Sequence, residues 1–279
     1  MCRYCVEFGN GTKWYLNPEN YRRELYEAKG HAYGFNMLAG AGKNTFETGS
    51  LVHFEDQTPD YKNAMAGQVA VDLMTQHSGQ VVPLEDAVKI LEMVPGDRFL
   101  LMHCSCRRYF GHGDVYSCLF FEPAVEKALA ERPWETDSKI ITKEEAIKME
   151  YEWDKKGLIH NVLDVGTDAD GKPPIVMCHC NATDCMPTNL RLALGHRHAL
   201  RKGEYVAKVD LAKCREGCKS FPACVARCNF GAIKYNPLEK VVYLEPTLCF
   251  GCGLCRAVCP TKAIELVDRT TYPALVDEW

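Results

Sequence analysis

The stretch CFGCGLCRAVCP, residues 249–260, decides the fold of the C-terminal part of the chain. Its cysteines follow the spacing C-x2-C-x2-C-x3-C-P, which is typical of a loop whose thiolates hold an iron–sulfur cube. Gly251 and Gly253 allow the backbone to adopt positive φ and to pass close to the cluster, so that N–H groups face the anionic sulfides. The first three cysteines serve one cube, and Cys259 is expected to bind the other cluster of a pair.

A second cysteine run lies upstream and repeats the first. Its gaps, C-x3-C-x5-C-x3-C, exceed the usual spacing by one residue in the first gap and by three in the second. The register is nevertheless kept, because Ala232-Ile233 is matched 31 residues later by Ala263-Ile264. An apolar, strand-like segment precedes each run and another follows it. This internal duplication predicts one unit built from two similar halves. The upstream run consists of Cys214, Cys218, Cys224 and Cys228.

Residues 204–268 resemble a two-cluster bacterial-type [4Fe-4S] ferredoxin domain on these two runs. The resemblance implies one cube held by Cys214, Cys218, Cys224 and Cys259, and a second held by Cys249, Cys252, Cys255 and Cys228. The first run departs from the family pattern, since Asn229 stands where proline is common and the second gap is longer. A three-iron cluster therefore stays open for the first site. A zinc ribbon or disulfides are further alternatives, and the duplicated register argues against both.

Length and composition limit the number of domains, the compartment and the partners expected for the chain. Its 279 residues favour two domains, residues 1–203 and 204–279. Sixteen cysteines grouped in C-x-C and C-x2-C patterns indicate metal binding in a reducing compartment. With a net charge of −4 and no basic block, nucleic acid and anionic membranes are poor partners. The sequence shows no apolar run of membrane-spanning length and no signal peptide, which predicts a cytoplasmic protein.

The predicted fold class is α+β, with a mainly helical N-terminal part that carries a small sheet, and a C-terminal dicluster ferredoxin fold. Two short helices joined by a turn, one after Thr58-Pro59 and one after Pro83, suggest a winged-helix-like element. Thr142 and Glu145 form a capping box at the start of a helix that ends at Gly157. Further helices are predicted at residues 18–29, 122–131 and 190–198.

Two apolar strands, residues 99–102 and 174–177, each run into a C-x-C pair. If these strands are neighbours, Cys104, Cys106, Cys178 and Cys180 meet at one sheet edge, with Cys118 and Cys185 on adjoining loops. A subset of these six is predicted to hold a third [4Fe-4S] cluster, with a tetrahedral zinc site as the rival and free buried cysteines as the remaining alternative. Three nearby histidines, His103, His112 and His179, are expected to support such a site more than to ligate it.

The first residues of the chain contain a C-x2-C pair, Cys2 and Cys5. A pair supplies two ligands, so a metal bound there needs partners from elsewhere in the chain. Idle thiols near a chain end are the alternative.

Much of the remaining chain resembles the N-terminal region of uncharacterised 4Fe-4S dicluster-containing proteins of anaerobic bacteria and archaea. The resemblance implies anaerobic electron transfer, and its motifs are far less specific than the two cysteine runs. It rests on the N-terminal C-x2-C pair with Lys13–Leu16, and on Val82–Asp86, Cys104–Arg107, Cys118-Leu119, Thr142–Ala146, Gly157–Asn161 and Cys178–Cys180.

The preferred function is an electron-transfer protein that relays single electrons through two [4Fe-4S] clusters, with a third in the N-terminal region, to or from a partner oxidoreductase. One alternative is a subunit of an anaerobic oxidoreductase whose N-terminal cluster binds substrate, which leaves open whether the chain is an enzyme. Another is a redox-sensing regulator that binds DNA, against which the acidic balance argues. No phosphate-binding loop and no flavin or nicotinamide signature is visible in the sequence.

Overall fold

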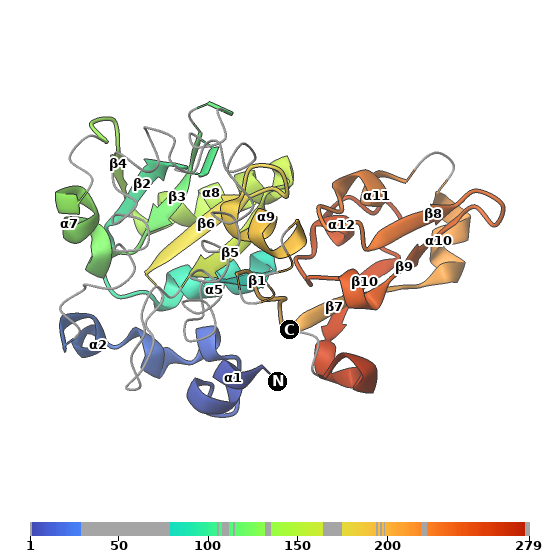
Figure 1. The fold of residues 1–279 in the computed structure, drawn as a ribbon, viewed down its shortest axis with the longest axis horizontal. Helices are drawn as coiled ribbons and strands as arrows, with labels where there is room; N and C mark the ends of the chain where they lie inside the picture. The colour runs from blue at the N-terminus through green and yellow to red at the C-terminus, as the bar shows by residue number, and fades with distance from the viewer. Residues whose placement is uncertain are drawn as a thin grey trace, which may run out of the picture.

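The computed structural model describes residues 2–28, 79–104, 106–107, 112–113, 115–131, 135–163, 175–193, 195, 197, 199–218 and 222–276. The helix expected after Thr58-Pro59 lies outside these residues, so the winged-helix-like element stays a prediction. The described chain forms a sheet with helices on both faces and, beside it, a smaller unit drawn in orange and red (Figure 1). Among the described helices, none combines the length and the apolar composition that crossing a membrane requires.

A six-stranded antiparallel sheet organises the N-terminal half, with the strand order β1-β5-β6-β3-β2-β4. It is larger than the small sheet that the sequence predicted. Two of its strands have only three residues, too few for an alternating pattern to be visible. The strands are β1 (Gln80–Val82), β2 (Phe99–His103), β3 (Tyr116–Phe120), β4 (Lys139–Ile141), β5 (Ile159–Leu163) and β6 (Val176–Cys180).

The two faces of this sheet are covered by different helices. Because successive residues of a strand point to opposite faces, Leu101 of β2 packs in one hydrophobic cluster and Leu100 in another. The first cluster includes α5 (Leu84–Met93) and α8 (Lys143–Lys156), and we call this side the α8 face. The second includes α7 (Glu122–Glu131), and we call that side the α7 face.

Helix α8 begins and ends as its sequence predicts. The Glu145 N–H donates to Thr142 Oγ1 at 3.2 Å, and the Thr142 N–H donates to Glu145 Oε2 at 2.8 Å, which completes the capping box. The helix ends at Gly157, whose φ of 86° is left-handed. A Cβ at Gly157 would meet the Arg227 side chain, which donates to the Lys155 carbonyl at the same helix end.

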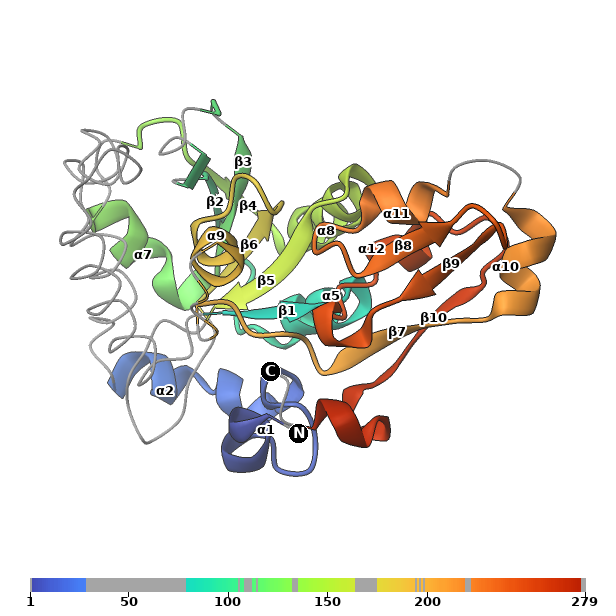
Figure 2. The same ribbon diagram turned by 45° about the vertical axis from the view of Figure 1, so that its right-hand side comes forward.

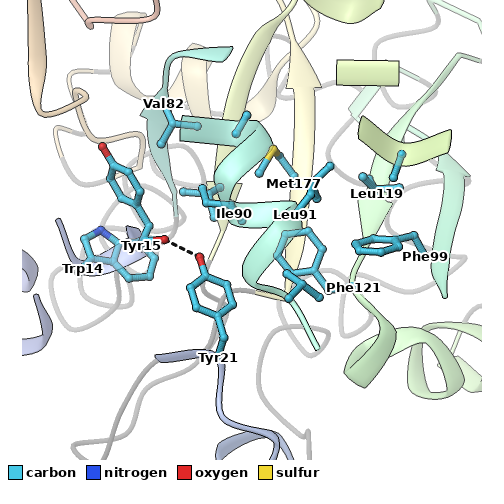
Figure 3. Packing of buried hydrophobic residues seen from close by; sticks show 14 of the residues in the cluster. Trp14, Tyr15, Tyr21, Val82, Ile90, Leu91, Phe99, Leu119, Phe121 and Met177 are labelled. Atoms are coloured by element: carbon cyan, nitrogen blue, oxygen red, sulfur yellow. Dashed lines mark hydrogen bonds between the residues drawn. The ribbon is translucent and has the colours of Figure 1, made fainter. Parts of the chain in front are cut away.

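The N-terminal segment packs on the α8 face through its aromatic side chains. Figure 3 shows Trp14, Tyr15 and Tyr21 beside Ile90 and Leu91 of α5, with the Tyr21 hydroxyl donating to the Tyr15 carbonyl at 2.6 Å. The helix predicted at 18–29 is interrupted, because the backbone is extended at Arg22. The segment contains α1 (Arg3–Phe8), η1 (Trp14–Leu16), η2 (Pro18–Tyr21) and α2 (Arg23–Ala28).

The C-terminal unit shows the duplication in its strand pairing. The first strand of the unit pairs with its last, and the two middle strands pair with each other, both antiparallel. Each half therefore interlocks with the other instead of forming its own sheet. The elements are β7 (Tyr205–Val209), α10 (Leu211–Gly217), α11 (Ala223–Arg227), β8 (Ile233–Asn236), β9 (Val241–Leu244), η4 (Pro246–Leu248), α12 (Leu254–Ala257), β10 (Ile264–Asp268), η5 (Arg269–Thr271) and η6 (Pro273–Leu275).

The two units lie side by side in Figure 2. A cluster of buried apolar side chains joins them at the expected domain boundary. Ile159 of β5 belongs to one buried cluster with Phe230 and Phe250, whose rings stack with centroids 3.8 Å apart. The linker also adds to the sheet, since the Arg201 N–H donates to the Gly79 carbonyl at 2.8 Å. Before this linker, the helix expected at 190–198 instead spans Met186–Leu192 (α9), with Pro187 in its first turn.

A buried carboxylate, Glu150, links α8 to the sheet. Its Oε2 lies 2.7 Å from His160 Nδ1 and 2.8 Å from His179 Nε2, and none of the three side chains is exposed. Burial opposes charge on His160, but the carboxylates of Asp154 and Glu150 outweigh it and raise the His160 pKa to about 9. Burial likewise opposes ionisation of Glu150, yet the two histidines lower its pKa to about 2. Glu150 and His160 therefore form a buried ion pair at neutral pH.

Replacing Glu150 by Gln should lower the free energy of unfolding at pH 7 by about 3 kcal/mol, because the charge on His160 loses its buried partner. The matched control is Glu152→Gln, an exposed position on the same helix, which should change it by less than about 0.5 kcal/mol. Urea unfolding of the intact protein, followed by circular dichroism, measures both.

The stability that the Glu150–His160 ion pair contributes should depend on pH in a defined direction. The pKa of His160 is raised in the folded state. The charge on His160 therefore stabilises the fold fully below the unfolded pKa, near 6.5, and this stabilisation is lost as pH rises through about 9. The difference in the free energy of unfolding between the parent protein and Glu150→Gln should therefore decrease as pH rises from about 6.5 to about 9. Equal effects of the two substitutions at pH 7 would contradict the ion pair.

Candidate metal centres

Four cysteines of the first predicted set line one pocket of the C-terminal unit, with a volume of about 290 Å³. Cys214 comes from α10, Cys218 follows it, and Cys224 lies on α11. Cys259 comes from the other repeat, after α12. The structure therefore brings together the whole set that the resemblance implied. Small and apolar side chains close the pocket, among them Val242, Val258 and Ile264.

The second set lines a pocket of similar size, about 320 Å³. Cys249 and Cys252 line it from a loop, Cys255 from the α12 helix that follows, and Cys228 from the upstream run. Each pocket thus takes three cysteines from one repeat and the fourth from the other.

Glycines and backbone N–H groups shape both pockets. Gly251 and Gly253 have φ of 73° and 79°, as the sequence predicts. A Cβ at Gly251 would lie 2.3 Å from the Tyr205 carbonyl oxygen, so only glycine fits this approach. The Ala207 N–H donates to Cys249 Sγ at 3.4 Å, and the Ala263 N–H donates to Cys259 Sγ at 3.3 Å. Such donors stabilise negative charge on sulfur and set the potential of a bound cluster.

The surroundings of these thiols fit a metal cluster. Burial raises the pKa of Cys224 to about 11 and that of Cys252 to about 12. Free thiols at these positions hold their protons at neutral pH, and binding of a soft metal displaces them. Four convergent thiols in each apolar pocket are a donor set that suits iron–sulfur clusters.

Asn229, which breaks the family pattern, has a structural role between the units. Its Oδ1 accepts from the Ala182 N–H at 3.2 Å, and its Nδ2 donates to the Gly157 carbonyl at 3.3 Å. A proline at this position has no side-chain group for either bond. Asn229 directly follows Cys228, so the departure from the pattern joins the second pocket to the N-terminal half.

The expected neighbour relation of the two C-x-C strands is wrong, because β3 lies between β2 and β6. Strands β2 and β6 are both antiparallel to β3, so they run parallel to each other and end at the same side of the sheet. Cys104 follows β2, and Cys180 ends β6, at that side. Cys118 lies on β3 opposite Cys178. The thiols do lie near one another, although strand β3 separates the two C-x-C strands and itself contributes Cys118.

Six cysteines of the N-terminal half lie near one another in two hydrogen-bonded groups, which together we call the six-thiol cluster: Cys104, Cys106, Cys118 and Cys178 in one group, and Cys180 and Cys185 in the other. Cys118 Sγ lies 3.7 Å from Cys178 Sγ. Thiol hydrogen bonds join Cys104 to both Cys106 and Cys118, and lower its pKa. A further thiol hydrogen bond joins Cys180 to Cys185, and the negative charge of Cys104 acts to raise the pKa of both. All six are buried or half-buried.

The histidines do not gather at these thiols as a group. His179 lies on the α8 face with Glu150, because it alternates with Cys178 and Cys180 along β6. His103 Nδ1 lies 3.2 Å from the Asp137 carboxylate. His112 Nδ1 lies 2.6 Å from Oδ1 of Asp184, the residue directly before Cys185.

Asp184 is a residue that the sequence did not single out. Its carboxylate binds the Arg107 guanidinium at 2.6 Å as well as His112. It thereby holds the chain that follows Cys106 against the loop between Cys180 and Cys185. Nothing in the local sequence marks this role, because an isolated aspartate in a turn is common.

Cys2 and Cys5 are both buried, with their sulfur atoms 3.4 Å apart. The partner from elsewhere that the sequence required is a carboxylate, because the Cys5 thiol donates to Glu204 Oε1 at 2.9 Å. Glu204 is 199 residues away along the chain, so no sequence spacing relates it to the pair.

Serine substitutions should show which cysteines share a cluster. Cys259→Ser should remove the cluster of the first pocket, although Cys259 lies in the downstream run, and Cys228→Ser should remove that of the second. We expect each variant to lose about four irons per chain. Iron analysis and electron paramagnetic resonance of the reduced protein measure this. If Cys259→Ser instead removed the signal that Cys249→Ser removes, the pairing by pocket would be refuted.

Comparison with known proteins identifies the C-terminal unit. Residues 213–263 match the family model of the 4Fe-4S dicluster domain. Archaeal-type glutamate synthase [NADPH] of Thermotoga maritima is 44% identical over 61 residues, which are 22% of this chain and 11% of that protein. Translation initiation factor rli1 of Schizosaccharomyces pombe is 38% identical over 60 residues, 21% of this chain and 10% of that protein.

A third relative, from Methanosarcina acetivorans, is one of the subunits of an ion-translocating oxidoreductase complex. It is 36% identical over 69 residues, 25% of either chain. The matched part thus spans between about a tenth and a quarter of the length of these relatives. No solved structure matches the chain. Residues 213–263 are a 4Fe-4S dicluster domain, and they follow an N-terminal region that is also rich in cysteine.

Proposed function

We propose that the protein is an iron–sulfur electron-transfer protein that relays single electrons through two [4Fe-4S] clusters to or from a partner oxidoreductase. The observation that carries this proposal is the pair of pockets, each lined by four cysteines. A cube bound by four thiolates has no iron left open for substrate, so its chemistry is the gain and loss of one electron. One similar protein is by name a subunit of an ion-translocating oxidoreductase complex, and another is an archaeal-type glutamate synthase [NADPH].

The arrangement of the cysteines supports transfer between the two centres. Cys224 and Cys228 lie at the start and end of α11, one at each pocket. Four residues of helix rise by about 6 Å. Cys255 and Cys259 make the same connection around α12. Two short helical turns therefore bridge the pockets, which keeps the proposed clusters close together.

A third [4Fe-4S] cluster, held by a subset of the six-thiol cluster, extends this relay in our proposal. Six thiols converge there, and soft thiolates suit iron–sulfur clusters as well as zinc. The position favours iron, because the site adjoins the second pocket. Ile159 is the cross-strand partner of Cys180 and also packs in the cluster that contains Phe250 and Cys252. The bond from Ala182 to Asn229 makes a second connection between them.

Counting irons and electrons tests this proposal. Anaerobically purified protein should contain about twelve irons and deliver about three electrons per chain, one from each cluster. The protein is reduced with dithionite, freed of reductant, and mixed with oxidised cytochrome c as an artificial acceptor, whose absorbance counts the electrons.

The double variant Cys118→Ser/Cys178→Ser should retain about eight irons and deliver about two electrons. Leu119→Val/Met177→Leu is the matched control, since it also changes a buried cross-strand pair of β3 and β6, on the α8 face, and should keep all three electrons. Eight irons in the parent protein, with a zinc lost from the Cys118/Cys178 variant, would replace the third cluster by a zinc site. Failure of the reduced parent protein to deliver electrons at all would refute the relay.

A further inference from the structure

Two neighbouring thiols and a carboxylate that is 199 residues from one of them in the sequence converge where the N-terminal segment meets the C-terminal unit. Cys2, Cys5 and Glu204 each offer one donor atom, and these atoms all lie within 4.8 Å of one another. The side chains are 1%, 2% and 1% exposed. The site belongs neither to the two pockets nor to the six-thiol cluster.

The Glu204 carboxylate lacks a basic partner among the residues that the structure describes. Its Oε1 accepts from the Cys5 thiol at 2.9 Å and from the Gln80 amide at 3.3 Å. Neither donor carries a positive charge, and a carboxylate taken out of water needs one. A cation bound between the carboxylate and the two sulfur atoms would supply that charge.

The atoms around the three groups are held in place, as in a formed binding site. The Trp14 N–H donates to Cys5 Sγ at 3.4 Å. Gln80, which bonds Glu204, also accepts from the Trp14 indole and donates to the Lys202 carbonyl at 3.2 Å. Such outer bonds orient metal ligands and keep their donor atoms converged.

We propose that Cys2, Cys5 and Glu204 bind a zinc ion, which fastens the N-terminal segment to the start of the dicluster domain. Zinc takes cysteine sulfur and carboxylate oxygen together in tetrahedral sites. Two thiols are too few for an iron–sulfur cube, and calcium or magnesium prefers oxygen ligands alone. The three side chains leave the fourth position of the tetrahedron for another ligand.

The site has a direct connection to the second pocket. The Arg269 N–H donates to the Glu204 carbonyl at 2.8 Å, and the Arg269 guanidinium donates to the Cys249 carbonyl at 2.7 Å. Zinc at Glu204 therefore fixes a strand end that also positions a cysteine of that pocket. This role needs no oxidation or reduction, because zinc has no redox chemistry in proteins.

Zinc analysis and X-ray absorption of the full, iron-loaded protein test the proposal. We expect about one zinc per chain, with a zinc edge that reports sulfur at about 2.3 Å and nitrogen or oxygen at about 2.0 Å. Cys2→Ser/Cys5→Ser should lose this zinc and keep its iron. Glu204→Gln preserves shape and should also lose zinc, whereas Glu265→Gln, an exposed carboxylate on β10, should keep it.

Several results would overturn the zinc site. One is a parent protein with no zinc after expression with added zinc. Another is zinc that remains in both the cysteine and the Glu204→Gln variants, which would place it elsewhere. A mass two hydrogens below that of the free thiols, mapped to a Cys2–Cys5 peptide, would replace the metal by a disulfide. Glu204→Gln keeps the test decisive if the cysteine variant does not fold.

Discussion

The exchange of cysteines between the two repeats is the constraint on which the C-terminal unit depends. Each pocket holds three thiols from one run and a fourth from the other, so neither pocket is complete without both halves of the chain. The strands repeat this dependence, since β7 at the start of the unit pairs with β10 at its end. Apolar side chains surround the thiols, and five of the eight cysteines are buried. A fold that is interlocked in this way keeps the two four-cysteine pockets at a constant separation.

The sheet of the N-terminal half separates two kinds of chemistry by the alternation of its strands. Along β6, Cys178 and Cys180 point to the α7 face, while His179 between them points to the α8 face and meets Glu150. One face therefore carries the thiols, and the other carries the buried Glu150–His160 ion pair and the His179 ring, which stacks on Trp153. Glu150 fastens α8 to β5 through His160 and to β6 through His179, so the packing on one face helps to position the cysteines of β6 on the other.

The junction between the units is built from a few buried polar side chains inside an apolar layer. Asn229 bonds the loop next to the six-thiol cluster, Arg269 bonds the loop of the second pocket, and Glu204 reaches the N-terminal cysteines. The stacked rings of Phe230 and Phe250 fill the space between them. Each contact ends within a residue or two of a cysteine. The geometry thus joins the redox unit to the sheet at the places where metal chemistry is proposed.

The sequence by itself determined the features that depend on neighbouring residues: the spacing of the cysteine runs, their duplication, the positive φ at Gly251 and Gly253, and the capping box at Thr142. These follow from local geometry, which a short stretch of chain encodes completely. Tertiary structure alone decided that β3 separates the two C-x-C strands, that His179 faces away from the thiols, and that Glu204 joins Cys2 and Cys5. Strand order and the docking of remote segments depend on the total burial of apolar surface over the whole chain, and no local pattern carries that sum.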